Sequence, residues 1–225
     1  MSPRATLQNN HMARILIVDD HPAIREGLAV RIGDQTDLEV CGEAAGVDDA
    51  LAKVKQLRPD LVIVDISLAS GNGLDLVKQI KSRHAGVRML VHSMYDESLY
   101  AERSLQAGAM GYVNKREAPD TMLMAIRQVL TDKIYLSPEM TERLLGRAAG
   151  RNANVEESPI LRLSDRELEI FQLIGQGLTT GAIANQLHLS VHTIDTHREK
   201  IKAKLKLKNA AELARSAVQW TLENG

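Results

Sequence analysis

Two patterns of apolar residues divide the chain. Between residues 13 and 134, short apolar runs alternate with longer segments in which apolar residues recur at helical spacing. The runs predicted as strands cover residues 15–18, 38–41, 61–66, 89–91 and 111–113. The segments predicted as helices cover residues 23–32, 47–57, 74–83, 98–107 and 121–130. This alternation favours an α/β domain, a doubly wound five-stranded parallel sheet with helices on both faces.

The alternation stops after residue 134. Residues 135–159 are predicted to form a linker with a short helix near its start, because alanine, glycine and asparagine dominate its centre. Residues 160–225 show only helical spacing, which predicts a second, all-α domain of four helices. Its helices are expected at residues 165–176, 180–187, 191–205 and 210–222. Residues 1–12 lack any apolar period and are interpreted as a tag or a disordered segment.

The length suits one or two domains, and the composition is that of an ordinary globular protein. The 225 residues are 44% hydrophobic and 25% charged, and no apolar run approaches the roughly 18 residues of a membrane span. A single cysteine, Cys41, cannot form an intrachain disulfide, and no secretion signal opens the chain. We therefore expect a cytoplasmic protein with no membrane partner.

Charge is distributed unevenly between the two domains. Residues 13–134 carry 15 Lys and Arg against 18 Asp and Glu, whereas residues 158–225 carry 9 against 7. The stretch 191–208 alone has six basic residues and two acidic ones. An acidic first domain and a basic patch in the second predict two different partners.

Chemically active residues follow the strands of the first domain. Asp19 and Asp20 follow the first strand, Asp65 lies at the end of the third, Ser93 follows the fourth and Lys115 the fifth. The carboxyl ends of parallel strands share one edge of the sheet, so these side chains are expected to meet. Three carboxylates favour a hard cation such as Mg²⁺. Asp65 is then a candidate nucleophile for phosphate, with Lys115 and Ser93 contacting phosphoryl oxygens.

Two other features of the first domain do not indicate a functional site. The glycine-rich turn at residues 71–73 is not followed by Gly-Lys-Ser/Thr, which argues against a nucleotide-binding loop. The histidines lack the spacing of a histidine metal site and are expected to be surface or packing residues. These histidines are His21, His84 and His92.

Residues 15–22, 62–66 and 111–115 together resemble the receiver domain of two-component response regulators, which has a flavodoxin-like fold. The resemblance implies that Asp65 accepts phosphate from a sensor histidine kinase. It also implies a metal site and a pair of switch residues that report phosphorylation. The implied Mg²⁺ ligands are Asp19, Asp20, Asp65 and the backbone carbonyl of Ser67, and the switch residues are Ser93 and Tyr112.

The basic helix of the second domain follows a short turn at residues 188–190. Two helices joined in this way predict a helix-turn-helix, whose second helix fits the major groove of DNA. A solvated basic helix in an ordinary bundle is the alternative. Ile194, Ile201 and Leu205 are expected to face inward. The outward, DNA-contacting candidates are Thr193, Asp195, Thr196, Arg198, Glu199, Lys200 and Lys202.

Several short stretches of the second domain resemble the LuxR-type helix-turn-helix of NarL/FixJ regulators. These stretches are 163–167, 177–179, 183–184, 189–194, 197–198 and 204–205. The resemblance implies a bacterial transcription factor that binds double-stranded promoter DNA as a homodimer when active, with RNA polymerase as a further candidate partner. Glu199 fits two roles: it accepts from a cytosine amino group or pairs with a neighbouring basic residue.

Two other functions compete with this interpretation. A Mg²⁺-dependent phosphatase of the haloacid dehalogenase type would use the same nucleophile, but it needs a second aspartate two residues later, where this chain has Ser67. We therefore predict slow autodephosphorylation and no turnover of external substrates. A DNA-binding protein that ignores phosphorylation, or a phosphate sink, is the second alternative.

Overall fold

The computed structural model describes residues 12–68, 71–149 and 159–224. All of the predicted N-terminal tag except Met12 lies outside these residues, as does the centre of the predicted linker. None of the helices within these ranges combines the length and apolar composition that crossing a membrane requires.

The first domain contains the predicted parallel sheet. Its strands lie in the order β2-β1-β3-β6-β7, and every pairing in this sheet is parallel. The strands are β1 (Ala13–Val18), β2 (Leu38–Ala44), β3 (Leu61–Val64), β6 (Arg88–Ser93) and β7 (Tyr112–Asn114). The predicted doubly wound α/β class is therefore confirmed.

Helices cover both faces of this sheet. They are α1 (Pro22–Gly33), α2 (Val47–Leu57), α3 (Gly73–Arg83), α4 (Glu97–Ala107) and α5 (Pro119–Leu130). Alternate residues of β1 enter different cores: Ile15 and Ile17 pack with α1 and α5, whereas Leu16 and Val18 pack with α2, α3 and α4. All four side chains are fully buried. This two-sided burial explains why the strand sequences are continuous apolar runs without alternation.

A two-stranded antiparallel hairpin departs from the prediction. It consists of β4 (Ser67–Leu68) and β5 (Gly71–Asn72), directly after the third sheet strand. Gly73 then allows the chain to pass beside Asp65, because a Cβ on Gly73 would lie 1.9 Å from the Asp65 carbonyl oxygen. The hairpin and this glycine fix the path of the backbone that follows Asp65.

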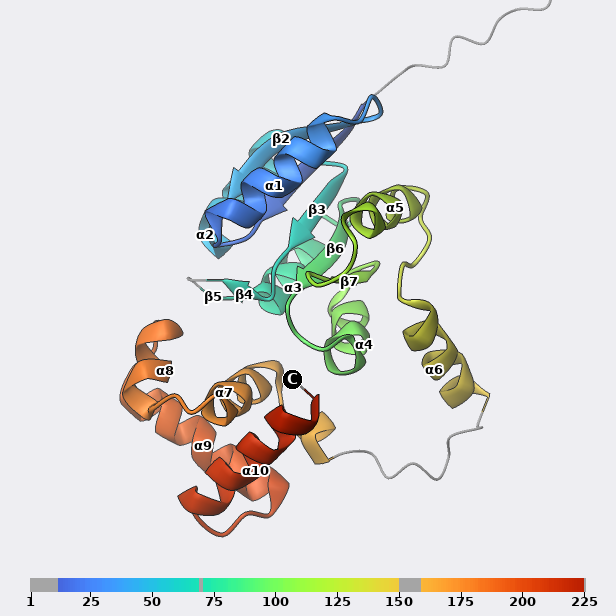
Figure 1. Cartoon of the computed structure of the whole chain (residues 1–225). Coiled ribbons are helices and arrows are strands. Elements are labelled where there is room, and N and C mark those ends of the chain that lie inside the picture. The colour runs from blue at the N-terminus through green and yellow to red at the C-terminus, as the bar shows by residue number, and fades with distance from the viewer. Residues whose placement is uncertain (1–11, 69–70, 150–158, 225) are drawn as a thin grey trace, which may run out of the picture.

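The second domain is helical, as predicted. After α6 (Pro138–Ala148) and the short 3₁₀ helix η1 (Pro159–Arg162), it contains four α-helices. They are α7 (Asp165–Gly175), α8 (Thr180–Gln186), α9 (Val191–Leu205) and α10 (Ala210–Asn224). Ser164 and Glu167 form a capping box at the start of α7. Figure 1 shows α7 as the helix of this domain that faces α3 and α4 of the first domain.

Candidate acidic site and nucleic-acid interface

Three of the predicted site residues meet at the carboxyl edge of the sheet. Lys115 Nζ lies 2.6 Å from Asp19 Oδ2 and 2.7 Å from Asp65 Oδ2. All three side chains are almost fully buried, at 3 to 4% exposure. The backbone holds the carboxylates in register, since the amide of Asp65 donates to Val18 O at 2.8 Å. The parallel strands thus place two acids and their counter-charge where the sequence predicted them.

Burial makes the charge of Asp65 costly. It raises the pKa of Asp65 to about 6; Lys115 opposes that shift, while Asp19 and Asp20 add to it. Burial would by itself lower the pKa of Lys115, but the charges of Asp65 and Asp19 outweigh it, and the pKa is raised. The charge of Lys115 therefore only partly offsets the burial of Asp65 and the repulsion from Asp19 and Asp20.

The unused oxygens of this cluster suit a divalent cation. Asp65 Oδ1 and Asp20 Oδ1 are buried and have no hydrogen-bond partner. Four side chains each place one ligand atom within 4.8 Å of the other three, namely those of Asp19, Asp20, His21 and Asp65. Buried oxygens without partners are expensive, and a cation with oxygen ligands would satisfy them. The three carboxylates therefore fit Mg²⁺.

The two predicted switch residues converge on Tyr95, a residue that the sequence did not identify. Tyr112 is fully buried, its hydroxyl donates to the Tyr95 carbonyl at 2.6 Å, and burial raises its pKa well above the ordinary value. The amide of Tyr95 lies 3.5 Å from Ser93 Oγ. Asn114 Nδ2 also donates to the Tyr95 carbonyl, at 2.8 Å. The backbone of Tyr95 thus connects the two switch residues, Ser93 and Tyr112.

The side chain of Tyr95 extends these contacts toward the second domain. Its hydroxyl lies 2.7 Å from Ser67 Oγ, beside the acidic cluster. Its ring stacks on that of Tyr100, with centroids 4.7 Å apart. The Tyr100 hydroxyl donates to Gln172 Oε1 of α7 at 3.0 Å. A continuous series of contacts therefore runs from the loop after Asp65 to α7.

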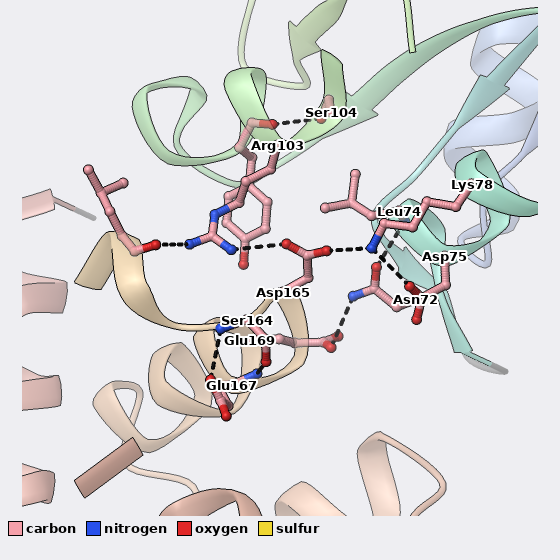
Figure 2. A network of polar contacts seen from close by, with 12 residues as sticks. Asn72, Leu74, Asp75, Lys78, Arg103, Ser104, Ser164, Asp165, Glu167 and Glu169 are labelled. Carbon is pink, nitrogen blue, oxygen red and sulfur yellow. Dashed lines mark hydrogen bonds and ion pairs between the residues drawn. The ribbon is translucent and has the colours of Figure 1, made fainter. Parts of the chain in front are cut away.

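A polar network joins the domains around the start of α7 (Figure 2). Asp165 lies between two basic residues of the first domain: Lys78 Nζ is 2.9 Å from Oδ2, and Arg103 Nη1 is 3.0 Å from Oδ1. Arg103 also donates to the Leu161 carbonyl at 3.1 Å. Asn72 of the hairpin donates to Glu169 at 3.3 Å. Burial raises the pKa of Glu169, against the opposing effect of Arg166.

The helix-turn-helix forms with its inner face as predicted. Ile194 and Ile201 are fully buried, and Leu205 is half-buried. Ser190 caps α9 by accepting from the Thr193 amide at 3.0 Å. Lys204 lies 2.6 Å from Glu167, which ties α9 to the capping box of α7. These contacts fix the orientation of α9 within its domain.

The predicted DNA-contacting residues are not equally accessible. Four of them are exposed, namely Asp195, Thr196, Glu199 and Lys200. The other three are half-buried, namely Thr193, Arg198 and Lys202. Lys202 Nζ lies 2.9 Å from Glu199 Oε1 on the next turn of the helix. The pairing alternative for Glu199 is thus present in the structure.

Comparisons with known proteins cover both domains. The family described as "Response regulator receiver domain" matches residues 15–127, and "Bacterial regulatory proteins, luxR family" matches residues 161–217. The oxygen regulatory protein NreC of Staphylococcus carnosus is 35% identical over 93% of this chain and 98% of its own length. The chain belongs to the response regulators with a LuxR-type domain.

Two further comparisons agree with this assignment. A putative transcriptional regulator of Pseudomonas aeruginosa is 38% identical to this response regulator over 90% of the chain and 94% of its own length. RcsB from Salmonella enterica, solved bound to promoter DNA with a phosphomimetic, is 24% identical and covers 91% of this chain and 98% of its own. Its TM-score is 0.63, and at this identity the likeness concerns the fold. The chain is thus a response regulator with receiver and DNA-binding domains.

Proposed function

We propose that Asp65 is the phosphoacceptor of this response regulator. A carboxylate oxygen of Asp65 would attack the phosphorus of a phosphohistidine on a sensor kinase, forming an acyl phosphate as the N–P bond breaks. The observation that supports this assignment is the buried cluster in which Lys115 holds one oxygen of Asp65, while the other has no partner. A divalent cation such as Mg²⁺, held by Asp19, Asp20, Asp65 and the Ser67 carbonyl, would neutralise phosphoryl oxygens.

Lys115 and Ser93 are proposed to bind the phosphoryl group. The Lys115 ammonium is already within ion-pair distance of Asp65, so it can pair with an oxygen attached there. The contact of Ser93 with the Tyr95 amide is long, at 3.5 Å, which leaves the hydroxyl able to donate elsewhere. Movement of Ser93 toward the phosphoryl group would act on Tyr95, which Tyr112 also contacts. This is the proposed switch.

We propose that the switch controls dimerisation and promoter binding by residues 160–225. The exposed side chains of α9 would enter the major groove, and two copies would occupy adjacent half-sites. The proposed domain boundaries are 13–134 for the receiver, 135–159 for the linker and 160–225 for the DNA-binding domain. Both proposed partners, the kinase and promoter DNA, are met in the cytoplasm, and RNA polymerase is a further candidate contact.

We propose that this protein does not turn over external phosphate esters. Ser67 occupies the position where a phosphatase of the haloacid dehalogenase type needs an acid, and its hydroxyl is engaged with Tyr95. We therefore propose that the acyl phosphate is lost only by slow autodephosphorylation.

The test is labelling by a small phosphodonor in Mg²⁺. Asp65→Asn should abolish the acid-stable, hydroxylamine-labile phosphate, because an amide cannot act as the nucleophile. Asp75→Asn is the matched control, since Asp75 is an exposed acid on α3. Retained labelling of the Asp65 variant would refute the assignment. Promoter binding is then compared before and after phosphorylation; unchanged affinity would favour a DNA-binding protein that ignores phosphorylation.

A further inference from the structure

The imidazole of His21 faces the acidic cluster from the start of α1. His21 is the N-cap residue of this helix, and its amide donates to Asp19 Oδ1 at 2.9 Å. Its ring atom Nδ1 lies 2.7 Å from Asp20 Oδ1 and 3.3 Å from Asp19 Oδ1. The backbone therefore holds the ring beside two carboxylates that belong to the proposed cation site.

Nδ1 contacts both carboxylates: it is within hydrogen-bond distance of Asp19 Oδ1, at 3.3 Å, and close to Asp20 Oδ1. Asp20 Oδ1 has no hydrogen-bond partner, although Nδ1 is only 2.7 Å away. Asp65 Oδ1, on a side chain that is 97% buried, also lacks a partner. Lys115 contacts the other carboxylate oxygen, Oδ2, of both Asp19 and Asp65. Lys115 thus contacts Oδ2 of Asp19 and Asp65, while Oδ1 of Asp19 and Oδ1 of Asp20 lie close to a nitrogen that can donate a lone pair.

We propose that His21 Nδ1 is an additional ligand of the cation and that it sets which cation the pocket prefers. Imidazole nitrogen is a poor ligand for Mg²⁺, which favours oxygen, but a good ligand for first-row transition ions. With His21 the pocket offers one nitrogen and three carboxylates within 4.8 Å of one another. The preference is therefore expected to shift from Mg²⁺ toward divalent transition ions, in the order of their affinity for nitrogen. This inference rests on the proposed cation site.

The histidine spacing in the sequence did not predict this role. A site made of histidines alone needs at least a second imidazole near the first. Here the single imidazole lies among carboxylates that follow two different strands. Asp65 is distant from His21 in the sequence and is brought to the cluster by the pairing of β1 with β3. His92 is a packing residue: it is 9% exposed, and burial together with Lys115 lowers its pKa to about 4.

The experiment titrates the full-length protein with Mn²⁺ and with Mg²⁺ by calorimetry. His21→Asn retains a side chain suited to the N-cap position. It should weaken Mn²⁺ binding at least about 10-fold, the lower end of what losing an outer-shell partner of a metal ligand costs, and change Mg²⁺ binding less than about twofold. His84→Asn, at the C-terminal end of α3, is the control and should change neither affinity.

Pulsed electron paramagnetic resonance of the Mn²⁺-loaded protein supplies a readout independent of affinity. The wild-type protein should show a ¹⁴N hyperfine coupling from a directly bound imidazole, and His21→Asn should lack it. Mn²⁺ that binds without nitrogen coupling, but is lost in Asp20→Asn, would overturn the role of His21 and leave the acidic site intact. Mn²⁺ binding that Asp20→Asn does not affect would instead overturn the proposed cation site, and the His21 inference with it. Circular dichroism of each variant checks that the fold is retained.

Discussion

Replacing the proposed phosphoacceptor should stabilise the receiver domain in the absence of divalent cations. The pKa of Asp65 is raised from 3.8 to about 6, chiefly by burial and despite the opposing Lys115. A raised carboxyl pKa means that the folded state prefers the protonated form, so stability falls as pH rises from 3.8 to about 6. At about 1.4 kcal/mol for each unit, the ionised carboxylate costs the fold up to about 3 kcal/mol above this range. Asp65→Asn removes that charge.

We therefore expect Asp65→Asn to raise the free energy of unfolding by about 1 to 3 kcal/mol at pH 7.5 in a chelator. The gain should fall to about half at pH 5 and vanish below pH 3.8, because wild-type Asp65 is then protonated in both states. Added Mg²⁺ should reduce the difference in free energy of unfolding between Asp65→Asn and the wild-type protein, since Mg²⁺ stabilises the wild-type protein by binding its native state.

Urea denaturation can follow the two domains separately. The four tyrosines, at positions 95, 100, 112 and 135, precede residue 150, whereas the single tryptophan is Trp220 of α10. Tyrosine circular dichroism therefore reports the receiver, and tryptophan fluorescence the DNA-binding domain. The control Asp75→Asn changes a side chain that is 65% exposed and should shift stability by less than about 0.5 kcal/mol. Equal or lower receiver stability of Asp65→Asn at pH 7.5 would refute the argument.

Other contacts lead to further predictions. Asp20→Ala should weaken Mg²⁺ binding measured by calorimetry, and unchanged affinity would remove Asp20 from the site. Lys200→Ala should weaken binding to every DNA sequence and reduce the salt slope by about one unit; a loss confined to one sequence would make Lys200 a base reader. Glu199→Gln should raise affinity uniformly in selections on randomised DNA, because Glu199 pairs with its neighbouring lysine; an altered preference at one base would indicate cytosine recognition instead. Arg103→Ala should increase the radius of gyration measured by X-ray scattering, because it removes the contacts with Asp165 and Leu161; Arg83→Ala is the exposed control, and equal radii would show that the network does not hold the domains together.

The sequence predicted those parts of the fold that are long enough to carry an apolar run or a helical period. A continuous apolar run predicts a buried strand such as β3, and apolar residues at helical spacing predict an amphipathic helix such as α5. The hairpin of β4 and β5 has two residues in each strand and hence no period to detect. Strand β2 extends to Ala44, beyond the predicted Cys41, because backbone pairing with β1 continues after the apolar run ends.

Some residues of the candidate site could also be placed from the sequence, and others could not. Asp19, Asp65 and Lys115 could be placed together from sequence, since the topology of a parallel sheet brings their strand ends to one edge. Tyr95 could not, because its loop has no regular spacing and its partners Ser67 and Tyr100 depend on tertiary packing. Glu169 and Gln172 of α7 are likewise polar residues that are buried, at 2% and 6% exposure. Both have a first-domain partner, which the helix sequence alone does not reveal.

The contact between the domains also constrains how DNA binding can be controlled. The receiver contacts α7 through Asp165, Glu169 and Gln172, whereas the outer residues of α9, such as Thr196 and Lys200, remain exposed in the same arrangement. The receiver therefore does not bury these residues of α9 in this arrangement. What the receiver does restrain is the direction in which α7, and with it α9, points relative to the first domain. In the proposed dimer, binding to two half-sites would depend on that direction, because both copies would have to engage DNA at a fixed spacing. A signal that reaches α7 through Tyr95 and Tyr100 would act on the pairing of two copies and leave the affinity of a single domain for one half-site unchanged.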